Sequence, residues 1–451
     1  MRNNFHYSKS AVAGAVLFTL VAVMGASPRR TQDAGATQTS NMDLDQLFQG
    51  RRYLEIERAL SSTSKLNDVD RTFFEGVMAN RRNRVAESIR MLEPLLPSLS
   101  TTNASRAVIA LSTLADDYEK SFRYSDAADA YTQLEKHYGP LMAANERQRA
   151  ITEAARWNLL RGAPAQSVEL QQPFTVPINR DKLGLPEVSI EVGKFHQSMI
   201  LDTGANLSVI SSSLALRLGL KLSTSVATSK GITGRQMAVH TAVIPELKLG
   251  EAKLRNVAVI VINDKDLLVP GLHYRIPGSI GFPVLSALGR ITFFADGTFG
   301  VGSNPAAGVS GSQENLFLQR LTPVVAAKIR GTERLFTIDT GSAGSFFTVR
   351  YYLEHKKDFT SQTVGDLDLA GAGGTQTYPA YLTGELSIKM GGACIDVNEV
   401  PVITSARGLP DNKFYGNVGQ RILGQFNSYT FDFQNMRFSA EGNTCKQGHA
   451  E

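Results

Sequence analysis

The chain has 451 residues, of which 42% are apolar and 20% are charged, and its formal net charge is +5. This composition can fill more than one buried core, and it excludes a disordered, collagen-like or low-complexity protein. At roughly 100–200 residues per domain the length predicts two or three domains, and so small a charge, without a basic run or aromatic-basic stripe, gives no support to nucleic-acid binding.

The first 26 residues have the pattern of an export signal. Arg2 and Lys9 precede an uncharged, mostly apolar stretch at residues 10–27, with small residues near its end. Because two arginines follow directly, two interpretations stay open: residues 1–26 form either a cleaved signal peptide or an uncleaved signal anchor. Both predict an exported protein, periplasmic or secreted, and only the second holds it at a membrane.

A helical region is predicted after a small, polar linker at residues 27–42. In residues 43–165 apolar side chains recur at steps of three and four, and Pro94 and Pro97 are expected to lie between helices. The stretch LADDYEKSFRYSDAADAYTQLEKHY is similar to a tetratricopeptide unit, in which paired helices stack on neighbouring pairs. A generic helical bundle is the alternative.

The pattern changes near Ala163, where Val, Ile, Thr and Gly increase and short alternating runs replace the helical period. A mostly β region is therefore predicted, with one lobe at residues 173–303 and another at 316–445. The Gly/Ser/Pro-rich residues 304–315 between them are predicted to form a linker.

Two cysteines, Cys394 and Cys445, are too few for a disulfide scaffold or a Cys-rich zinc module. In an exported protein they either form one disulfide or remain as two buried thiols, and the sequence leaves both possibilities open.

The two parts of the β region repeat one another. In each part an alternating run, a glycine turn and a second apolar run precede an Asp-Thr-Gly loop, at residues 202–205 (DTGA) and 339–342 (DTGS). Further along, GSIGFPVLSALGRITF at residues 278–293 aligns without a gap with GNVGQRILGQFNSYTF at 416–431. One Asp-Thr-Gly occurs by chance, but two copies in the same context indicate an internal repeat.

The residue types of these loops suit acid–base chemistry. Each apolar strand delivers an aspartate to the end of a sheet, and the glycine permits a tight turn whose N–H stays near the carboxylate. Two such loops face to face would place two carboxyl groups in contact, and the pair would share one proton. One carboxylate then acts as a base on water and the other as an acid toward a carbonyl.

With this repeat, residues 173–440 resemble the aspartic proteases, and the retropepsin type more than the pepsin type. The resemblance implies a multi-domain protein whose mainly-β part is bilobal, with closed-barrel-like lobes, behind the N-terminal α-helical region. It further implies that Asp202 and Asp339 form the catalytic pair and that Thr203 and Thr340 make hydrogen bonds between the lobes.

Active-site loop support is expected from Gly204, Gly341 and Ser342. The hydroxyl of Ser342 is predicted to donate to Asp339, a bond that Ala205 cannot give in the first loop. Asp339 is therefore predicted to be the more readily ionised member of the pair.

Between each Asp-Thr-Gly and its downstream Gly segment lies a glycine-containing stretch, where retropepsins carry a hairpin over the cleft. The glycines predicted to form these substrate-binding flaps are Gly231, Gly234, Gly371, Gly373 and Gly374. Ordinary hairpin tips are the alternative, and no tyrosine of the kind found on pepsin flaps stands in residues 228–240.

These observations predict an aspartic endopeptidase that cuts peptide or protein substrates, with a helical region that docks a partner or the substrate. A non-catalytic peptide-binding protein on the same fold is the first alternative. A glycosidase is the second, but its carboxyl groups stand roughly 5–9 Å apart, whereas paired loops imply near contact. No cofactor is predicted, and the seven histidines are scattered without the i, i+4 spacing of a zinc protease.

Overall fold

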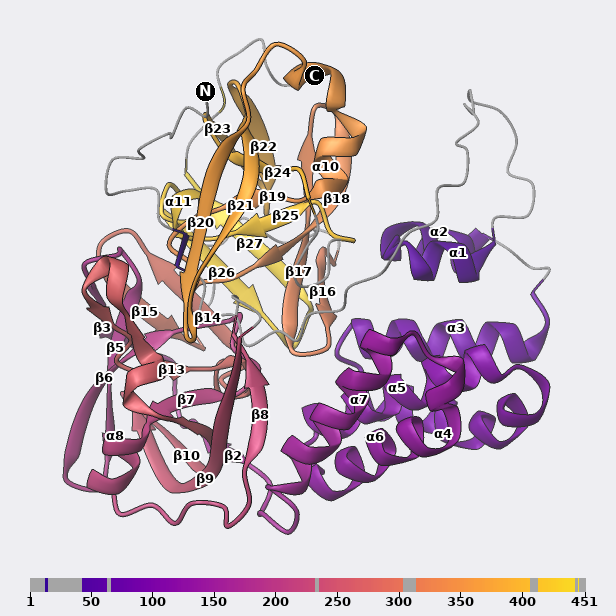
Figure 1. Cartoon of the computed structure of the whole chain (residues 1–451), viewed down its shortest axis with the longest axis horizontal. Coiled ribbons are helices and arrows are strands. Elements are labelled where there is room, and N and C mark those ends of the chain that lie inside the picture. The colour runs from indigo at the N-terminus through magenta and orange to yellow at the C-terminus, as the bar shows by residue number, and fades with distance from the viewer. Residues whose placement is uncertain are drawn as a thin grey trace.

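The computed structural model describes residues 13–14, 43–62, 66–231, 235–302, 314–405, 413–442 and 445. The predicted signal segment, except residues 13–14, lies outside the described residues, as do the linker at 27–42, flap residue Gly234 and most of the linker at 304–315. From residue 43 onward, helices come first and mostly strands follow (Figure 1), so the predicted helical region and the predicted mostly β region are confirmed. None of the helices in these ranges is long and apolar enough to cross a membrane.

The helical region begins at a side-chain cap, because Asp43 accepts hydrogen bonds from the backbone N–H groups of Asp45 and Gln46. From α3 onward each α-helix packs against the next one in the chain, an arrangement common to tetratricopeptide units and generic bundles. The helices are α1 (Leu44–Gln49), α2 (Tyr53–Ser62), α3 (Asp68–Arg81), α4 (Val85–Thr102), α5 (Ala104–Lys120), α6 (Tyr124–Tyr138), η1 (Gly139–Leu141) and α7 (Ala144–Asn158).

The prediction that Pro94 and Pro97 lie between helices is wrong, because both lie inside α4. A proline in a helix interior costs about 3 kcal/mol relative to alanine, since it removes a backbone hydrogen bond and crowds the preceding turn. α4 packs against α3 on one side and α5 on the other. Burial of Leu92 and Leu99 in these contacts offsets the local preference.

The first half of the β region (residues 173–302, with β2 before it) builds a sheet in the order β2-β10-β7-β13-β6-β5-β9-β8, and β9 also pairs with β10, so that the sheet closes on itself. Its elements are β2 (Ser167–Glu169), β3 (Phe174–Pro177), β4 (Asn179–Arg180), β5 (Pro186–Val192), β6 (Phe195–Leu201), β7 (Ser208–Ser211), α8 (Ser212–Arg217), β8 (Ala227–Lys230), β9 (Gln236–Leu249), β10 (Ala252–Ile262), η2 (Asp264–Leu267), β11 (Leu268–Val269), η3 (Pro270–Leu272), β12 (Tyr274–Arg275), β13 (Ser279–Ile280), α9 (Phe282–Ala287), β14 (Arg290–Phe294) and β15 (Thr298–Val301).

The second half (residues 314–442) builds a sheet in the order β1-β20-β21-β24-β19-β25-β18-β17-β22-β23, with β16 on β17. Its elements are β16 (Leu316–Gln319), β17 (Thr322–Ile329), β18 (Thr332–Ile338), β19 (Phe346–Phe347), α10 (Val349–Glu354), η4 (Lys356–Phe359), β20 (Gly365–Gly371), β21 (Gly374–Leu382), β22 (Leu386–Met390), β23 (Ala393–Val397), β24 (Pro401–Ile403), β25 (Gly416–Val418), α11 (Gln420–Leu423), β26 (Ser428–Asp432) and β27 (Arg437–Glu441), and β1 is Ala13–Gly14.

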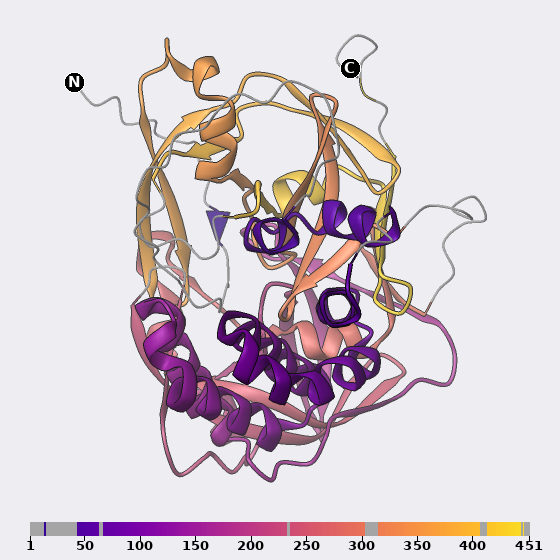
Figure 2. The ribbon, with the colours of Figure 1, turned by 90° about the vertical axis from the view of Figure 1, so that its right-hand side faces the viewer.

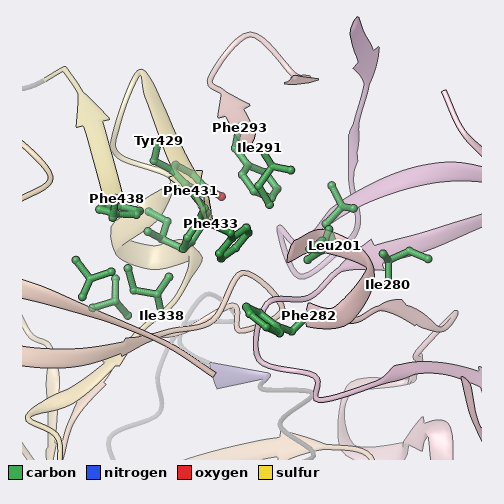
Figure 3. Close-up of a cluster of buried hydrophobic side chains, with 14 of the residues drawn as sticks. Leu201, Ile280, Phe282, Ile291, Phe293, Ile338, Tyr429, Phe431, Phe433 and Phe438 are labelled. Carbon is green, nitrogen blue, oxygen red and sulfur yellow. The ribbon is translucent and has the colours of Figure 1, made fainter. Parts of the chain in front are cut away.

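A third sheet, in the order β27-β26-β14-β15-β3, contains strands from both halves. The repeated segments meet here: β14 and β26 pair antiparallel, with Thr292 opposite Thr430 and their hydroxyl oxygens 2.9 Å apart. Aromatic side chains of both strands share one apolar cluster beneath (Figure 3), and the rings of Phe293 and Tyr429 stack with centroids 4.8 Å apart. The shared sheet and core join the halves behind the Asp-Thr-Gly loops.

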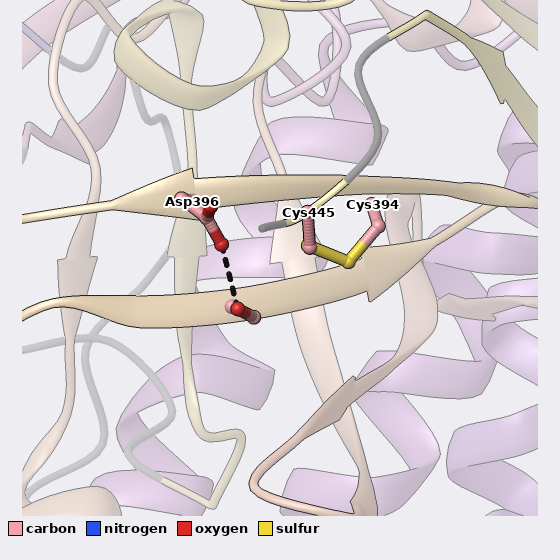
Figure 4. Close-up of a disulfide and its surroundings, with 4 residues drawn as sticks. Cys394, Asp396 and Cys445 are labelled. Carbon is pink, nitrogen blue, oxygen red and sulfur yellow. Dashed lines mark hydrogen bonds between the residues drawn. A yellow bond between two sulfur atoms is a disulfide. The ribbon is translucent and has the colours of Figure 1, made fainter. Parts of the chain in front are cut away.

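Cys394 on β23 is bonded to Cys445 (Figure 4), which resolves the alternative that the sequence left open. Beside the disulfide, Ser387 donates a hydrogen bond of 2.6 Å to Asp396 across the β22–β23 pair. The disulfide therefore ties Cys445 to a hairpin at the edge of the second sheet.

Candidate active site

The two predicted catalytic aspartates stand at equivalent positions of the two halves. Asp202 follows β6 and Asp339 follows β18, and each strand runs parallel to the strand of its own Gly segment, β13 or β25. The backbone N–H of Asp202 donates to Ile280 (3.0 Å) and that of Asp339 to Val418 (3.0 Å). The repeated sequence thus builds the same strand pair twice, and each pair holds one aspartate at its end.

The threonines of the two loops interlock across the halves. The backbone N–H of Thr203 donates to the hydroxyl of Thr340 (3.0 Å), and the backbone N–H of Thr340 donates to the hydroxyl of Thr203 (3.1 Å). Each hydroxyl also donates to a strand of the opposite half, Thr203 to Ile338 and Thr340 to Leu201. Both threonines are fully buried, so the hydrogen bonds of their N–H groups and hydroxyls set the position of one loop relative to the other.

The glycines bring the two carboxyl groups together. Gly204 and Ala205 each donate a backbone N–H to Oδ1 of Asp202 (3.0 Å), and Gly341 donates to Oδ1 of Asp339 (2.9 Å). A Cβ on Gly204 would lie 2.6 Å from Cγ of Asp339, and one on Gly341 would lie 2.4 Å from Cγ of Asp202. Each carboxyl therefore rests against the glycine of the opposite loop, a place that no side chain can share.

The electrostatics favour a shared proton. Burial raises the pKa of Asp339 to about 6, and burial together with the charge of Asp339 raises the pKa of Asp202 well above its usual value. Two carboxylates this close cannot both ionise easily, so the pair favours a state in which one of them carries a proton. Both Oδ2 atoms are buried without a donor among the described residues.

The predicted donation from Ser342 to Asp339 is wrong, and the order in which the two aspartates ionise stays a prediction. Ser342 donates its hydroxyl to the backbone carbonyl of Gly344 (3.0 Å) instead of to Asp339. Asp202 even accepts one more backbone N–H than Asp339, which lowers its pKa. Burial, followed by the charge of the facing Asp339, still raises the pKa of Asp202 well above its usual value.

These raised pKa values predict a stability that depends on pH. The folded protein binds a proton at the pair more tightly than the unfolded chain, whose aspartates titrate near 3.8. The resulting contribution to the free energy of unfolding is complete below about pH 4 and is lost as the pH rises through about 6. In urea unfolding at pH 4 to 7, the double variant Asp202→Asn/Asp339→Asn should lose less stability over this range than the wild type.

Burial also raises the pKa values of Asp117 and Glu119 to about 7. Because both residues are present in the wild type and in the double variant, their effect on stability cancels in the comparison. Equal losses of stability in the wild type and the double variant would contradict the shared proton.

The predicted flap glycines that are described lie at two hairpins that meet, the first formed by β8 and β9 and the second by β20 and β21. Gly231 follows β8 of the first hairpin, and a Cβ there would lie 1.9 Å from the carbonyl oxygen of Ala372 in the second. Gly371 pairs with Gly374 at the tip of the β20–β21 hairpin, and the N–H of Gly373 donates to Asp266 of the first half (2.9 Å). The tip of the second hairpin therefore rests on the first half.

One polar residue beside the pair was missed by the sequence reasoning. Gln420 donates from Nε2 to the backbone carbonyl of Thr340 (2.8 Å), and its Oε1 accepts from Arg180 of the first half (2.6 Å). It follows the second Gly segment at the position where the first half has Phe282. A polar residue in an otherwise apolar repeated segment was the available signal.

No group of three or more His, Cys, Asp or Glu side chains that could hold a metal ion occurs within the described ranges. The polar groups at the pair are carboxyls, backbone N–H groups and threonine hydroxyls, which suit proton transfer to and from a bound water.

Comparison with known proteins addresses the first half directly. Residues 187–284, which include Asp202, match the sequence model of the family described as aspartyl protease. An aspartyl protease domain therefore lies in the β region. A solved retropepsin-like aspartic protease from Rickettsia conorii is 17% identical, with a TM-score of 0.23, and the likeness covers 29% of this chain and 100% of that one. No curated protein matches the chain.

Proposed function

We propose that this protein is an aspartic endopeptidase of retropepsin type that hydrolyses peptide bonds with a water molecule activated between Asp202 and Asp339. In this proposal residues 173–303 and 316–445 are two lobes, and each supplies one Asp-Thr-Gly loop. The observation that carries the proposal is the contact of each carboxyl with the glycine of the opposite loop. The aspartyl protease domain at residues 187–284 supports it.

The chemistry follows from the shared proton. The ionised carboxylate accepts a proton from water, whose oxygen attacks the carbonyl carbon of the peptide bond, while the protonated carboxyl donates its proton to the carbonyl oxygen. In the resulting tetrahedral diol the C–N bond breaks as the pair gives its proton to the leaving nitrogen and one diol hydroxyl returns its proton to the pair. The products are a carboxylic acid and an amine, and the pair again holds one proton.

The hairpins are proposed to act as flaps. Asp202 is 0% and Asp339 1% exposed, so a substrate can reach them only when the covering segments move apart. The contact between Gly231 and Ala372 and the hydrogen bond from Gly373 are the interactions that such an opening would break. Separation of the tips would admit an extended peptide, and closure would exclude bulk water.

The protein is further proposed to act outside the cytoplasm, periplasmic or secreted. The disulfide between Cys394 and Cys445 supports this location, because such bonds persist in oxidising compartments. Membrane attachment is proposed only if residues 10–27 remain as an anchor. The helical region, with tetratricopeptide-like pairs, is proposed to dock a partner protein or the substrate.

Peptide cleavage measured from pH 3 to 7, with and without a statine-type inhibitor, tests the activity. We expect cleavage that the inhibitor abolishes and that depends on pH, because only the pair that holds one proton has both a base for water and an acid for the carbonyl oxygen. Binding of peptides without cleavage at any of these pH values would instead establish the alternative, a non-catalytic peptide-binding protein.

A further inference from the structure

The helical region binds a hairpin of the second half. β16 packs against α3, and Phe317 on β16 is fully buried. The guanidinium of Arg82 lies 3.6 Å from the centroid of the Phe317 ring and donates to the backbone carbonyl of Leu316 (2.7 Å). The ring of Tyr53 on α2 lies on Phe317 with centroids 5.6 Å apart. The hairpin thus occupies the surface that α2 and α3 present to the β region.

The turn of this hairpin carries a charge into the helical region. Arg320 lies between β16 and β17 with φ 57°, and its guanidinium pairs with Glu153 of α7 (2.9 Å) and Glu119 of α5 (3.3 Å). Both glutamates are 0–2% exposed. Glu119 also accepts a hydrogen bond of 2.7 Å from Nε1 of Trp157. Glu153 has a second cation in Arg156 of its own helix (3.0 Å), whereas Arg320 is the cation that pairs with Glu119. A buried acid is costly without its partner, so Arg320 links the hairpin to the two helices mainly through Glu119.

The same helices also contact the first half. α7 packs against β8, a strand of the hairpin that ends near Gly231. Trp157 at the end of α7 and Leu160 just after it belong to one buried apolar cluster with Ala227 of β8 and Met237 of β9. Figure 2 views the molecule from the side of the helices, and in it the helical region lies in front of strands of both halves.

We propose that the helical region is an intramolecular clamp. Arg320 seats the β16–β17 hairpin in it, and α7 supports the first hairpin, so that the clamp holds the two halves in the arrangement that brings Asp202 and Asp339 together. Because the chain itself fills this surface, a partner protein has to bind another face of the helices. Only the catalytic consequence of the clamp rests on the proposed function.

The test uses the full chain with Arg320→Met and a matched control, Arg330→Met. Arg330 stands at the next hairpin turn with a similar φ of 47°, but it pairs with Asp358 on the surface, with side chains 46% and 39% exposed. Trp157 is the only tryptophan, so its fluorescence reports the helical region, while urea unfolding followed by near-ultraviolet circular dichroism is dominated by the tyrosines and phenylalanines of the whole chain.

In the wild type and Arg330→Met we expect the two signals to change together in one transition. In Arg320→Met the tryptophan emission should shift before unfolding, and the two transitions should separate. Coincident transitions and unchanged emission in Arg320→Met would overturn the clamp. If that variant does not fold, Arg320→Lys replaces it, with a partial separation expected and coincidence again contradicting the proposal.

Cleavage measured on the same proteins separates the two proposals. We expect kcat/KM to fall about 10-fold to 100-fold in Arg320→Met, since small misplacements of reacting groups have effects of this size, and to be unchanged in Arg330→Met. A wild type without protease activity but with the expected fluorescence would refute the proposed function and leave the clamp in place. Full cleavage in Arg320→Met together with coincident transitions would refute the clamp and leave the proposed function in place.

Discussion

Replacing either Asp202 or Asp339 by asparagine is expected to abolish peptide hydrolysis while the fold is kept. An amide has nearly the shape of a carboxyl and can still accept the backbone hydrogen bonds at Oδ1. It can neither take a proton from water nor hold the proton that the pair shares. Because both groups act in one step, each single change should lower kcat by on the order of 1,000-fold or more.

Asp117→Asn is the matched control for this result. Asp117 is also buried, with a pKa that burial raises to about 7, but it lies in α5, where it accepts hydrogen bonds from Asn80 and Ser88. Its replacement removes a buried carboxyl that does not touch the Asp-Thr-Gly loops, so cleavage should persist. Undiminished cleavage by both Asp202→Asn and Asp339→Asn would show that the pair is not the catalytic site.

The second large effect is expected from Gly341→Ala. The new Cβ would lie 2.4 Å from Cγ of Asp202, well inside the contact distance of two carbon atoms. The carboxyl of Asp202 has to move, and it then loses its hydrogen bonds from Gly204 and Ala205. We expect kcat to fall on the order of 100-fold, measured with the same peptide as for the wild type.

Gly384→Ala provides the comparison, because a Cβ at Gly384 meets no atom within 4 Å and its backbone is not left-handed. That variant should cleave like the wild type. If Gly341→Ala also kept full activity, the close contact between the loop glycine and the opposite carboxyl would have no role in catalysis.

Much of the candidate site was predictable because the repeat carries it. Each Asp-Thr-Gly follows an apolar run, and each Gly segment recurs at nearly the same distance, so the sequence predicted two equivalent loops at the ends of two strands. The structure pairs β6 with β13 and β18 with β25 in the same register, as identical local patterns favour. The change from helices to strands near Ala163 was predictable for the same reason, since periodicity reflects which face of an element is buried.

Other features depended on contacts between distant segments. Pro94 and Pro97 lie in a helix because α4 is held by its neighbours, which local propensity does not report. The hydroxyl of Ser342 found a carbonyl acceptor two residues away, although the motif favoured the carboxyl. A side chain with several possible partners is decided by the geometry of the folded loop.

By itself, therefore, the sequence determined the order of helices and strands and the positions of the two aspartates, because these follow from periodicity and from a repeated motif. Only the tertiary structure decided that Cys394 meets Cys445, that Gln420 reaches Thr340 and that Arg320 enters the helical region. Each of these contacts joins residues whose spacing carries no pattern, and the packing of whole elements brings them within reach.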